Sequence, residues 1–111
     1  MAIKYYTNPE KKQVIAVMSG TRYDAVNRMA KMMNAENSEF IMSPHLFTKY
    51  LMPEQYKVTV TCDERDVYDE EVGKQVAKKK LLRNYYKSVD KRIAMFKRDI
   101  ANFIKTWNET I

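Results

Sequence analysis

Residues 69–110 read DEEVGKQVAKKKLLRNYYKSVDKRIAMFKRDIANFIKTWNET, and this stretch decides the fold. It contains no proline, and its only glycine, Gly73, stands near its beginning. Large apolar side chains recur in it at alternating steps of four and three residues, which is the heptad period of a helix that packs along one seam. The seam consists of Leu82, Tyr86, Val89, Ile93, Phe96, Ile100, Phe103 and Trp107. The sequence therefore predicts one long C-terminal helix.

The order of charges supports this helix. Acidic residues precede it and occupy its first turn, and basic residues dominate further along, which is the order that the helix dipole favours. The acidic residues are Asp63, Glu64, Asp66, Asp69, Glu70 and Glu71. They lack the glycine and the ligand positions of a calcium-binding loop, so we interpret them as a solvated helix start.

A straight helix of this length would be roughly 63 Å long, whereas a compact domain of 111 residues is about 35 Å across. Either the helix bends back near Asn84 or Ser88 and packs within its own chain as a helical hairpin, or it pairs with another copy. Burying each large seam residue is worth about 1.5–3 kcal/mol, and leaving all of them exposed would create an unusually large apolar patch. We expect a homodimer or higher oligomer that uses the seam.

The preceding residues favour a small sheet. Two β-rich runs, 3–7 (IKYYT) and 14–18 (VIAVM), flank the turn-forming residues 8–12 (NPEKK), which predicts a hairpin. Thr21 and Asp24 have the spacing of a helix N-terminal capping box. The apolar positions after them follow helical spacing, and they are Val26, Met29, Ala30 and Met33.

Two further strands are expected, a short one at 40–42 and a longer one at 56–62, where apolar and polar residues alternate. The predicted fold class is α+β: an antiparallel sheet built from the hairpin and these two strands, one helix, and the long C-terminal helix. All 111 residues form one domain in this prediction, with a β-rich core over 1–68 and the helix, or helical hairpin, over 69–111.

Composition argues against an enzyme. His45 is the only histidine and Cys62 the only cysteine. They could act together only if the fold joined them, and a lone cysteine that ends a strand is usually a core residue. No cluster has metal-ligand spacing and no phosphate-binding glycine loop is present, so we expect no metal and no cofactor. No run of signal-peptide or membrane-spanning length occurs, which predicts a cytoplasmic protein without membrane contact.

The net charge of +6 indicates an anionic partner. One candidate phosphate site is the turn 19–22, where a glycine and a helix N-terminus stand beside Arg22. The alternative is an ordinary strand-to-helix turn. A second candidate is the segment 78–87 (KKKLLRNYYK), in which basic residues alternate with tyrosines that could stack on a base. The alternative is the solvated face of an amphipathic helix.

Together these segments define a predicted ligand-binding set: Thr21, Arg22, Arg28, Lys80, Arg83, Asn84, Tyr85 and Tyr86. In this hypothesis the arginines and Lys80 contact phosphates, and Tyr85 or Tyr86 lies against a base.

Four stretches carry a resemblance to small proteins encoded by phages and prophages of Gram-positive bacteria. They are residues 4–17 (KYYTNPEKKQVIAV), 20–28 (GTRYDAVNR), 50–62 (YLMPEQYKVTVTC) and 68–93 (YDEEVGKQVAKKKLLRNYYKSVDKRI). In architecture, basic charge and helical ending the chain also resembles the Thoeris anti-defence sponge proteins. Those proteins join a small sheet to long C-terminal helices, form oligomers, and sequester cyclic nucleotide signals without cleaving them. No ligand-binding motif of that group is matched residue by residue.

The resemblance implies a phage anti-defence protein that binds and sequesters a nucleotide-type immune signal in the cytoplasm of an infected bacterial host. Two alternatives stay open. One is an inhibitor that binds a host defence protein, such as a CRISPR effector or a nuclease. The other is a nucleic-acid-binding accessory protein, whose affinity would fall steeply with salt.

Overall fold

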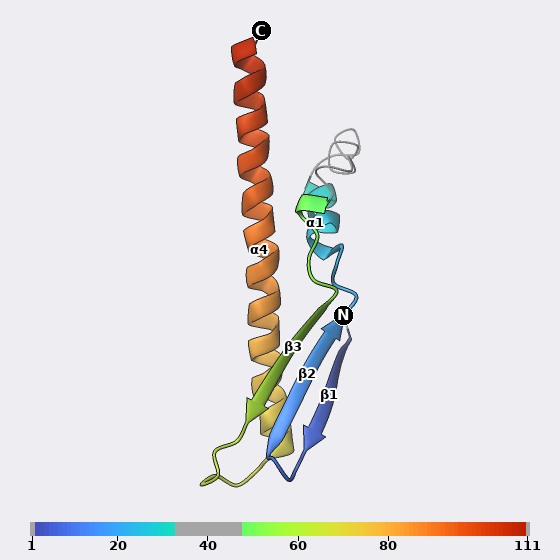
Figure 1. Cartoon of the computed structure of the whole chain (residues 1–111), viewed down its shortest axis with the longest axis vertical. Coiled ribbons are helices and arrows are strands. Elements are labelled where there is room, and N and C mark those ends of the chain that lie inside the picture. Colours follow the sequence, from blue (N-terminus) through green and yellow to red (C-terminus); the bar gives the residue numbers. More distant parts are fainter. Residues whose placement is uncertain (1, 33–47, 111) are drawn as a thin grey trace. The chain divides into compact units, whose positions relative to one another are not determined.

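The computed structural model of the chain describes residues 2–32 and 48–110. Its elements, in chain order, are β1 (Ile3–Asn8), β2 (Gln13–Ser19), α1 (Asp24–Met32), β3 (Gln55–Thr61) and α4 (Glu70–Thr110) (Figure 1). The predicted α+β class is confirmed, as are the hairpin, the longer of the two further strands and the long C-terminal helix. The strand expected at 40–42 lies outside the described residues.

The chain divides into two compact units. The first comprises Met1–Thr21 and Pro53–Tyr86, and the second comprises Arg22–Met52 and Lys87–Ile111. The first half of α4 therefore belongs to the first unit and its second half to the second. α4 is one helix of 41 residues, with no break at Asn84 or Ser88.

The first unit contains a three-stranded antiparallel sheet in the order β1-β2-β3. The hairpin turn is set by Asn8, whose side-chain oxygen accepts the Lys11 N–H at 3.3 Å, as the Asn-Pro sequence predicts. Lys12 ends the turn with φ +51°. Its carbonyl accepts the Cys62 N–H at 2.8 Å, and its ammonium donates to the carbonyls of Glu64 and Asp66. These bonds attach the loop after β3 to the hairpin turn.

One face of this sheet forms the core of the first unit. The β2 side chains Val14, Ala16 and Met18 are fully buried on it. α4 covers this face: Gly73 approaches Val14 so closely that a Cβ at Gly73 would lie 2.6 Å from the Val14 Cγ2. About three turns later on the same side of α4, Tyr85 packs edge-on against Tyr56 of β3, with ring centroids 5.8 Å apart.

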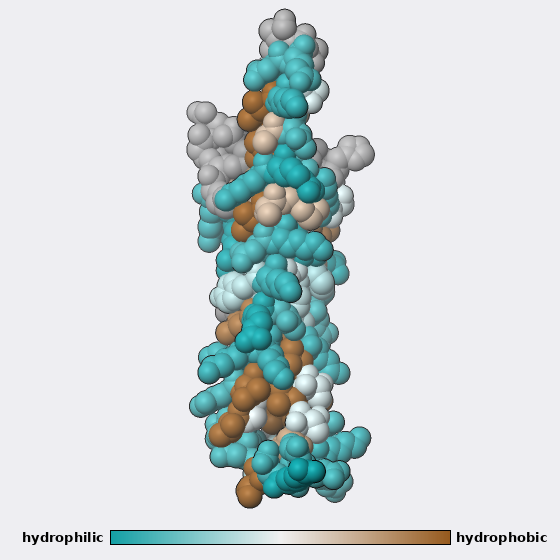
Figure 2. Space-filling view, turned by 90° about the vertical axis from the view of Figure 1, so that its left-hand side faces the viewer, coloured by the Kyte–Doolittle hydropathy of each residue, from teal (hydrophilic) through white to brown (hydrophobic). Residues whose placement is uncertain are grey.

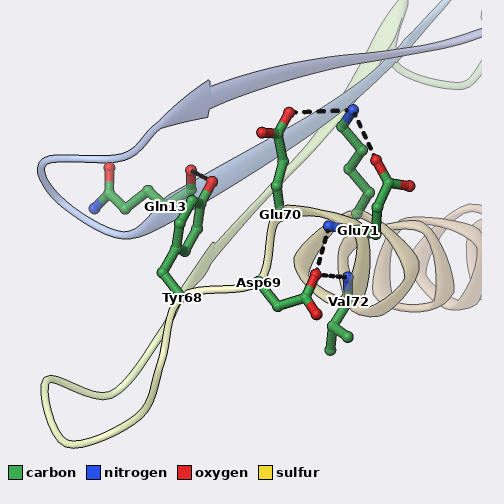
Figure 3. Close-up of polar contacts among 7 residues, drawn as sticks. Gln13, Tyr68, Asp69, Glu70, Glu71 and Val72 are labelled. Atoms are coloured by element: carbon green, nitrogen blue, oxygen red, sulfur yellow. Dashed lines mark hydrogen bonds and ion pairs between the residues drawn. The ribbon is translucent and has the colours of Figure 1, made fainter.

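The beginning of α4 is capped by Asp69 (Figure 3). Its Oδ1 accepts the N–H groups of Glu71 and Val72 at 3.0 and 3.2 Å. Lys74 forms ion pairs with Glu70 at 3.3 Å and with Glu71 at 3.7 Å. The hydrogen bond that Lys74 donates to the Glu70 carboxylate is the main cause of the raised pKa of Lys74. The interpretation of the acidic run as a solvated helix start agrees with this geometry, and the cap at Asp69 was not predicted.

The buried stripe of α4 differs from the predicted seam in its first part. Along the first unit the buried residues are Ala77, Leu81 and Tyr85, which recur at steps of four. Leu82 is half-buried and Tyr86 is 40% exposed. Leu82 and Tyr86 each follow directly after a residue that faces the sheet. The sheet contacts the row of side chains at steps of four residues, which contains Leu81 and Tyr85 and leaves their neighbours at its side.

The second unit packs around Tyr50, which is fully buried. The Tyr50 ring lies edge-on to Phe96 of α4, with centroids 5.4 Å apart, and its hydroxyl donates to Asp99 at 2.5 Å. Lys49 forms an ion pair with the same carboxylate at 2.7 Å. Two turns before Asp99 on α4, Arg92 donates to the Leu51 carbonyl at 2.9 Å. The segment before Pro53 is thereby fixed to the second half of α4.

Helix α1 also belongs to the second unit and buries Ala25, Val26 and Met29. It begins at Asp24, so its N-cap is Tyr23, and the predicted cap at Thr21 is wrong. The Thr21 hydroxyl instead donates to the Pro53 carbonyl at 2.6 Å. Within the described residues, no helix is both long enough and apolar enough to cross a membrane.

Candidate functional site

The clearest candidate for an anion-binding surface is a basic cluster on the first half of α4. We define it as Lys79, Lys80 and Arg83, which are all exposed. Residues three and four apart on a helix have Cβ atoms about 5–6 Å apart, so Arg83 adjoins both lysines on one face. That face points away from the sheet, because the opposite side of the helix carries Leu81 and Tyr85. From Lys74 to Tyr86 the sequence has five basic residues and no acidic one.

The two tyrosines next to the cluster have different environments. Tyr85 is only 1% exposed and packs against Tyr56, so its ring has no surface on which a base could stack. Tyr86 is 40% exposed and lies one turn after Arg83. Its ring is held against that of Tyr85, with centroids 5.1 Å apart. Tyr86 is therefore the member of the predicted pair that reaches solvent beside the basic cluster, and the exposed Asn84 lies at its edge.

In the turn 19–22, the donors of Gly20 and Thr21 are bonded within the chain. Gly20 has φ +75°, and the N–H groups of Gly20 and Thr21 both donate to the Glu54 carbonyl, at 2.9 and 3.3 Å. The Thr21 side chain is buried and bonded to Pro53. These hydrogen bonds connect the end of β2 to the residue before β3. They agree with the alternative interpretation, in which 19–22 is an ordinary strand-to-helix turn.

Arg22 and Arg28 belong to the second unit, whereas the basic cluster belongs to the first. Arg22 is exposed and Arg28 is half-buried, and both have polar or electrostatic partners within the chain. The structure therefore brings together Lys80, Arg83, Asn84 and Tyr86 of the predicted set. It does not join Thr21 to them.

An apolar cavity of about 250 Å³ lies at the end of the sheet near the hairpin turn. Val14, Val60 and Gly73 contribute to its wall, and Cys62 lies in it with its thiol directed at backbone carbonyls such as that of Asp63, 3.5 Å away. Figure 2 shows hydrophobic side chains gathered at this end of the first unit. Among the described residues no group of histidine, cysteine and carboxylate side chains could hold a metal ion. His45 lies outside them.

A second apolar surface lies near the end of α4 in the second unit. Phe103, Ile104 and Trp107 are 54%, 51% and 59% exposed and line a shallow hollow of about 210 Å³. The Phe103 and Trp107 rings are stacked, with centroids 6.5 Å apart. Of the predicted interface, Val89 and Phe96 are buried within the chain itself, and Ile93 and Ile100 are half-buried.

The sequence reasoning did not include the sheet face that points away from α4. It bears Lys4 and Lys57 on the two outer strands and Tyr6, which is 55% exposed. The alternation of polar and apolar residues in β3, which places Lys57, Thr59 and Thr61 on one face, is the sequence signal that could have identified it.

Comparisons of the chain with protein-family models, with curated proteins and with solved structures found no match.

Proposed function

We propose that this protein is a non-catalytic binding protein that sequesters a nucleotide-type anionic ligand. The observation that carries the proposal is the exposed basic cluster of α4 with Tyr86 beside it. Three cations on adjacent turns suit the phosphates of a nucleotide, and an aromatic ring one turn further along suits its base. In the context implied by the phage resemblance, the ligand is a cyclic nucleotide immune signal, and the protein acts as an anti-defence protein in the host cytoplasm.

Calorimetric titration with cyclic nucleotides tests this proposal. Each exposed cationic contact is worth up to about 1 kcal/mol, so the double variant Lys80→Ala/Arg83→Ala should bind roughly 30-fold more weakly. The matched control is Lys11→Ala/Lys31→Ala, which removes the same charge from the hairpin turn and α1 and should bind like the wild type. Chromatography of the ligand after release should recover it intact. Absence of binding heat with every cyclic nucleotide, or equal affinity in both double variants, would refute the proposal.

A nucleic-acid ligand is a second candidate, and the open shape of the basic cluster favours it. The three side chains lie on the convex surface of a helix, and neither of the two cavities described above includes any of them. A polyanion can lie along such a surface without a pocket. A salt-dependent affinity for DNA or RNA that the Lys80→Ala/Arg83→Ala variant loses, without any response to cyclic nucleotides, would select this candidate.

We also propose that copies of the chain associate through the apolar surface of Phe103, Ile104 and Trp107. Three half-exposed apolar side chains of this size, two of them aromatic, leave roughly 300 Å² of apolar area in contact with water, which is at the scale of functional patches on soluble proteins. Phe103 and Trp107 continue the heptad seam beyond the part that the chain covers itself, and Ile104 lies beside them. Docking of a host defence protein on the same surface is the alternative.

A further inference from the structure

The sheet face that points away from α4 has an unusual composition. The strand register places its side chains in two neighbouring cross-strand rows, Lys4–Val17–Lys57 and Tyr6–Ile15–Thr59. Adjacent strands are about 4.8 Å apart, so the two lysines of the first row are about 10 Å apart across the sheet. Apolar side chains of β2 occupy the space between them.

The central strand indicates that this face is covered in the working protein. From Val14 to Met18, β2 is apolar at every position. Such continuous apolar runs are typical of strands that are buried on both faces, whereas a sheet with one solvated face shows strict alternation. Here the α4 side of β2 is fully buried, but Ile15 and Val17 on the other side are only half-buried.

Charge argues against a second copy as the covering partner. The three strands contain Lys4 and Lys57 and no acidic residue. Symmetric pairing of two such faces would bring four lysines into one interface without a carboxylate from any strand. Like charges placed opposite each other destabilise an interface, whereas an anionic partner would complement the two lysines.

Tyr6 narrows the class of anion. Its ring is 55% exposed and stands on the outer strand, next to Lys4 on the same strand and diagonal to Val17 on β2. An unpaired base has a flat apolar face that stacks on an exposed aromatic ring and lies against aliphatic side chains, while its phosphates reach cations at the rim. Single-stranded nucleic acid therefore matches the apolar centre and the basic edges of this face together.

We infer that this open sheet face binds single-stranded nucleic acid, with Tyr6 stacking on a base and with Lys4 and Lys57 contacting phosphates on either side. The inference goes beyond the proposed nucleotide site. The basic cluster lies on the far side of α4 from the sheet, so each surface can be altered while the other stays intact.

Fluorescence anisotropy with short labelled oligothymidylate and oligouridylate tests the inference on the full chain. Tyr6→Ala should weaken binding by about 10-fold or more, because base stacking supplies much of the affinity, and Tyr6→Phe should bind like the wild type. Lys4→Ala/Lys57→Ala should reduce the slope of log affinity against log salt by about 1.4, or about 0.7 for each lost phosphate contact. Circular dichroism of each variant verifies that the sheet is folded.

The triple variant Lys79→Ala/Lys80→Ala/Arg83→Ala separates the two surfaces. If it abolishes oligonucleotide binding while Tyr6→Ala and the strand lysine variant bind normally, the sheet face is not the site. Equal affinity for duplex and single strand would also overturn the inference, because stacking on Tyr6 requires unpaired bases. Cyclic nucleotide binding that persists in Tyr6→Ala would leave the proposed function standing whether or not the sheet binds a strand.

Discussion

Replacing Gly73 by alanine tests the close packing of α4 on the sheet. In a solvated helix this change would stabilise the protein by up to about 1 kcal/mol, because alanine loses less backbone entropy on folding. Here the new methyl group would lie 2.6 Å from the Val14 Cγ2. Val14 is 1% exposed and, as a β-branched residue, has little rotamer freedom to move aside. Forcing a methyl group into such a core costs about 1–3 kcal/mol, so we expect a net loss of about 1 kcal/mol.

A double-mutant cycle of Gly73→Ala with Val14→Ala measures the contact between the two positions directly. Val14→Ala alone should cost about 2 kcal/mol through lost burial and the cavity left behind. In that background the clash is gone, so adding Gly73→Ala should stabilise by about 0.5–1 kcal/mol. The two substitutions therefore couple by roughly 2 kcal/mol, which is within the range for residues in contact.

Urea unfolding followed by far-ultraviolet circular dichroism measures all four free energies of unfolding. Gln75→Ala is the control, because it introduces alanine at an exposed position two residues further along the same helix. It should change the free energy of unfolding little. If Gly73→Ala stabilises the protein equally in both backgrounds, Gly73 does not lie against Val14 and the packing described for α4 is wrong.

Two further outcomes concern the second unit. Hydrogen bonds from Lys49 and Tyr50 lower the pKa of Asp99. The carboxylate therefore stabilises the fold above the ordinary aspartate pKa of about 4, and this contribution is lost as the pH falls through the lower pKa of the folded state. Asp99→Asn should unfold at a lower urea concentration than the wild type at pH 7, and the difference should shrink as the pH falls below the ordinary aspartate pKa. A difference independent of pH would contradict this. Phe103→Ala/Trp107→Ala should shift sedimentation toward the monomer while the control Val67→Ala/Val72→Ala, also at exposed positions, does not; a monomeric wild type would rule out the proposed association.

The long helix and the hairpin were predictable because each has a strong local signature. The helix has a long span without proline, an acidic first turn and periodic apolar residues, and the hairpin has Asn8-Pro9 between two β-rich runs. These features act over a few neighbouring residues, so they can be recognised without knowing the rest of the fold.

The exact face of the helix was not predictable from the same pattern. The sequence offers two adjacent pairs of similar residues, Leu81-Leu82 and Tyr85-Tyr86. A heptad seam selects the second member of each pair, and packing on a sheet selects the first. Only the partner surface decides between them, and the structure shows Leu81 and Tyr85 facing the sheet.

The candidate site was predictable only where it is continuous in sequence. Lys80, Arg83 and Tyr86 lie on neighbouring turns of one helix, so their proximity follows from helix geometry. The Tyr50–Asp99 bond joins residues 49 positions apart, and the bond from Thr21 to Pro53 spans 32. No local pattern reports such pairings, which is why Thr21 was assigned to a cap and a phosphate site rather than to the junction with β3.

The two units alternate along the sequence, and this order has a consequence for how the chain folds. β1 and β2 are joined by a tight turn. β3 is separated from β2 by the segment that contains α1, so it can pair with β2 only when Ser19 and Gln55 meet. During synthesis the hairpin therefore leaves the ribosome before β3 does. Until β3 follows, the backbone N–H and C=O groups on one edge of β2 have no strand partner. Chain closure depends only logarithmically on loop length, with each doubling costing about 0.6 kcal/mol. The delay is thus a matter of timing and exposure to aggregation more than of final stability.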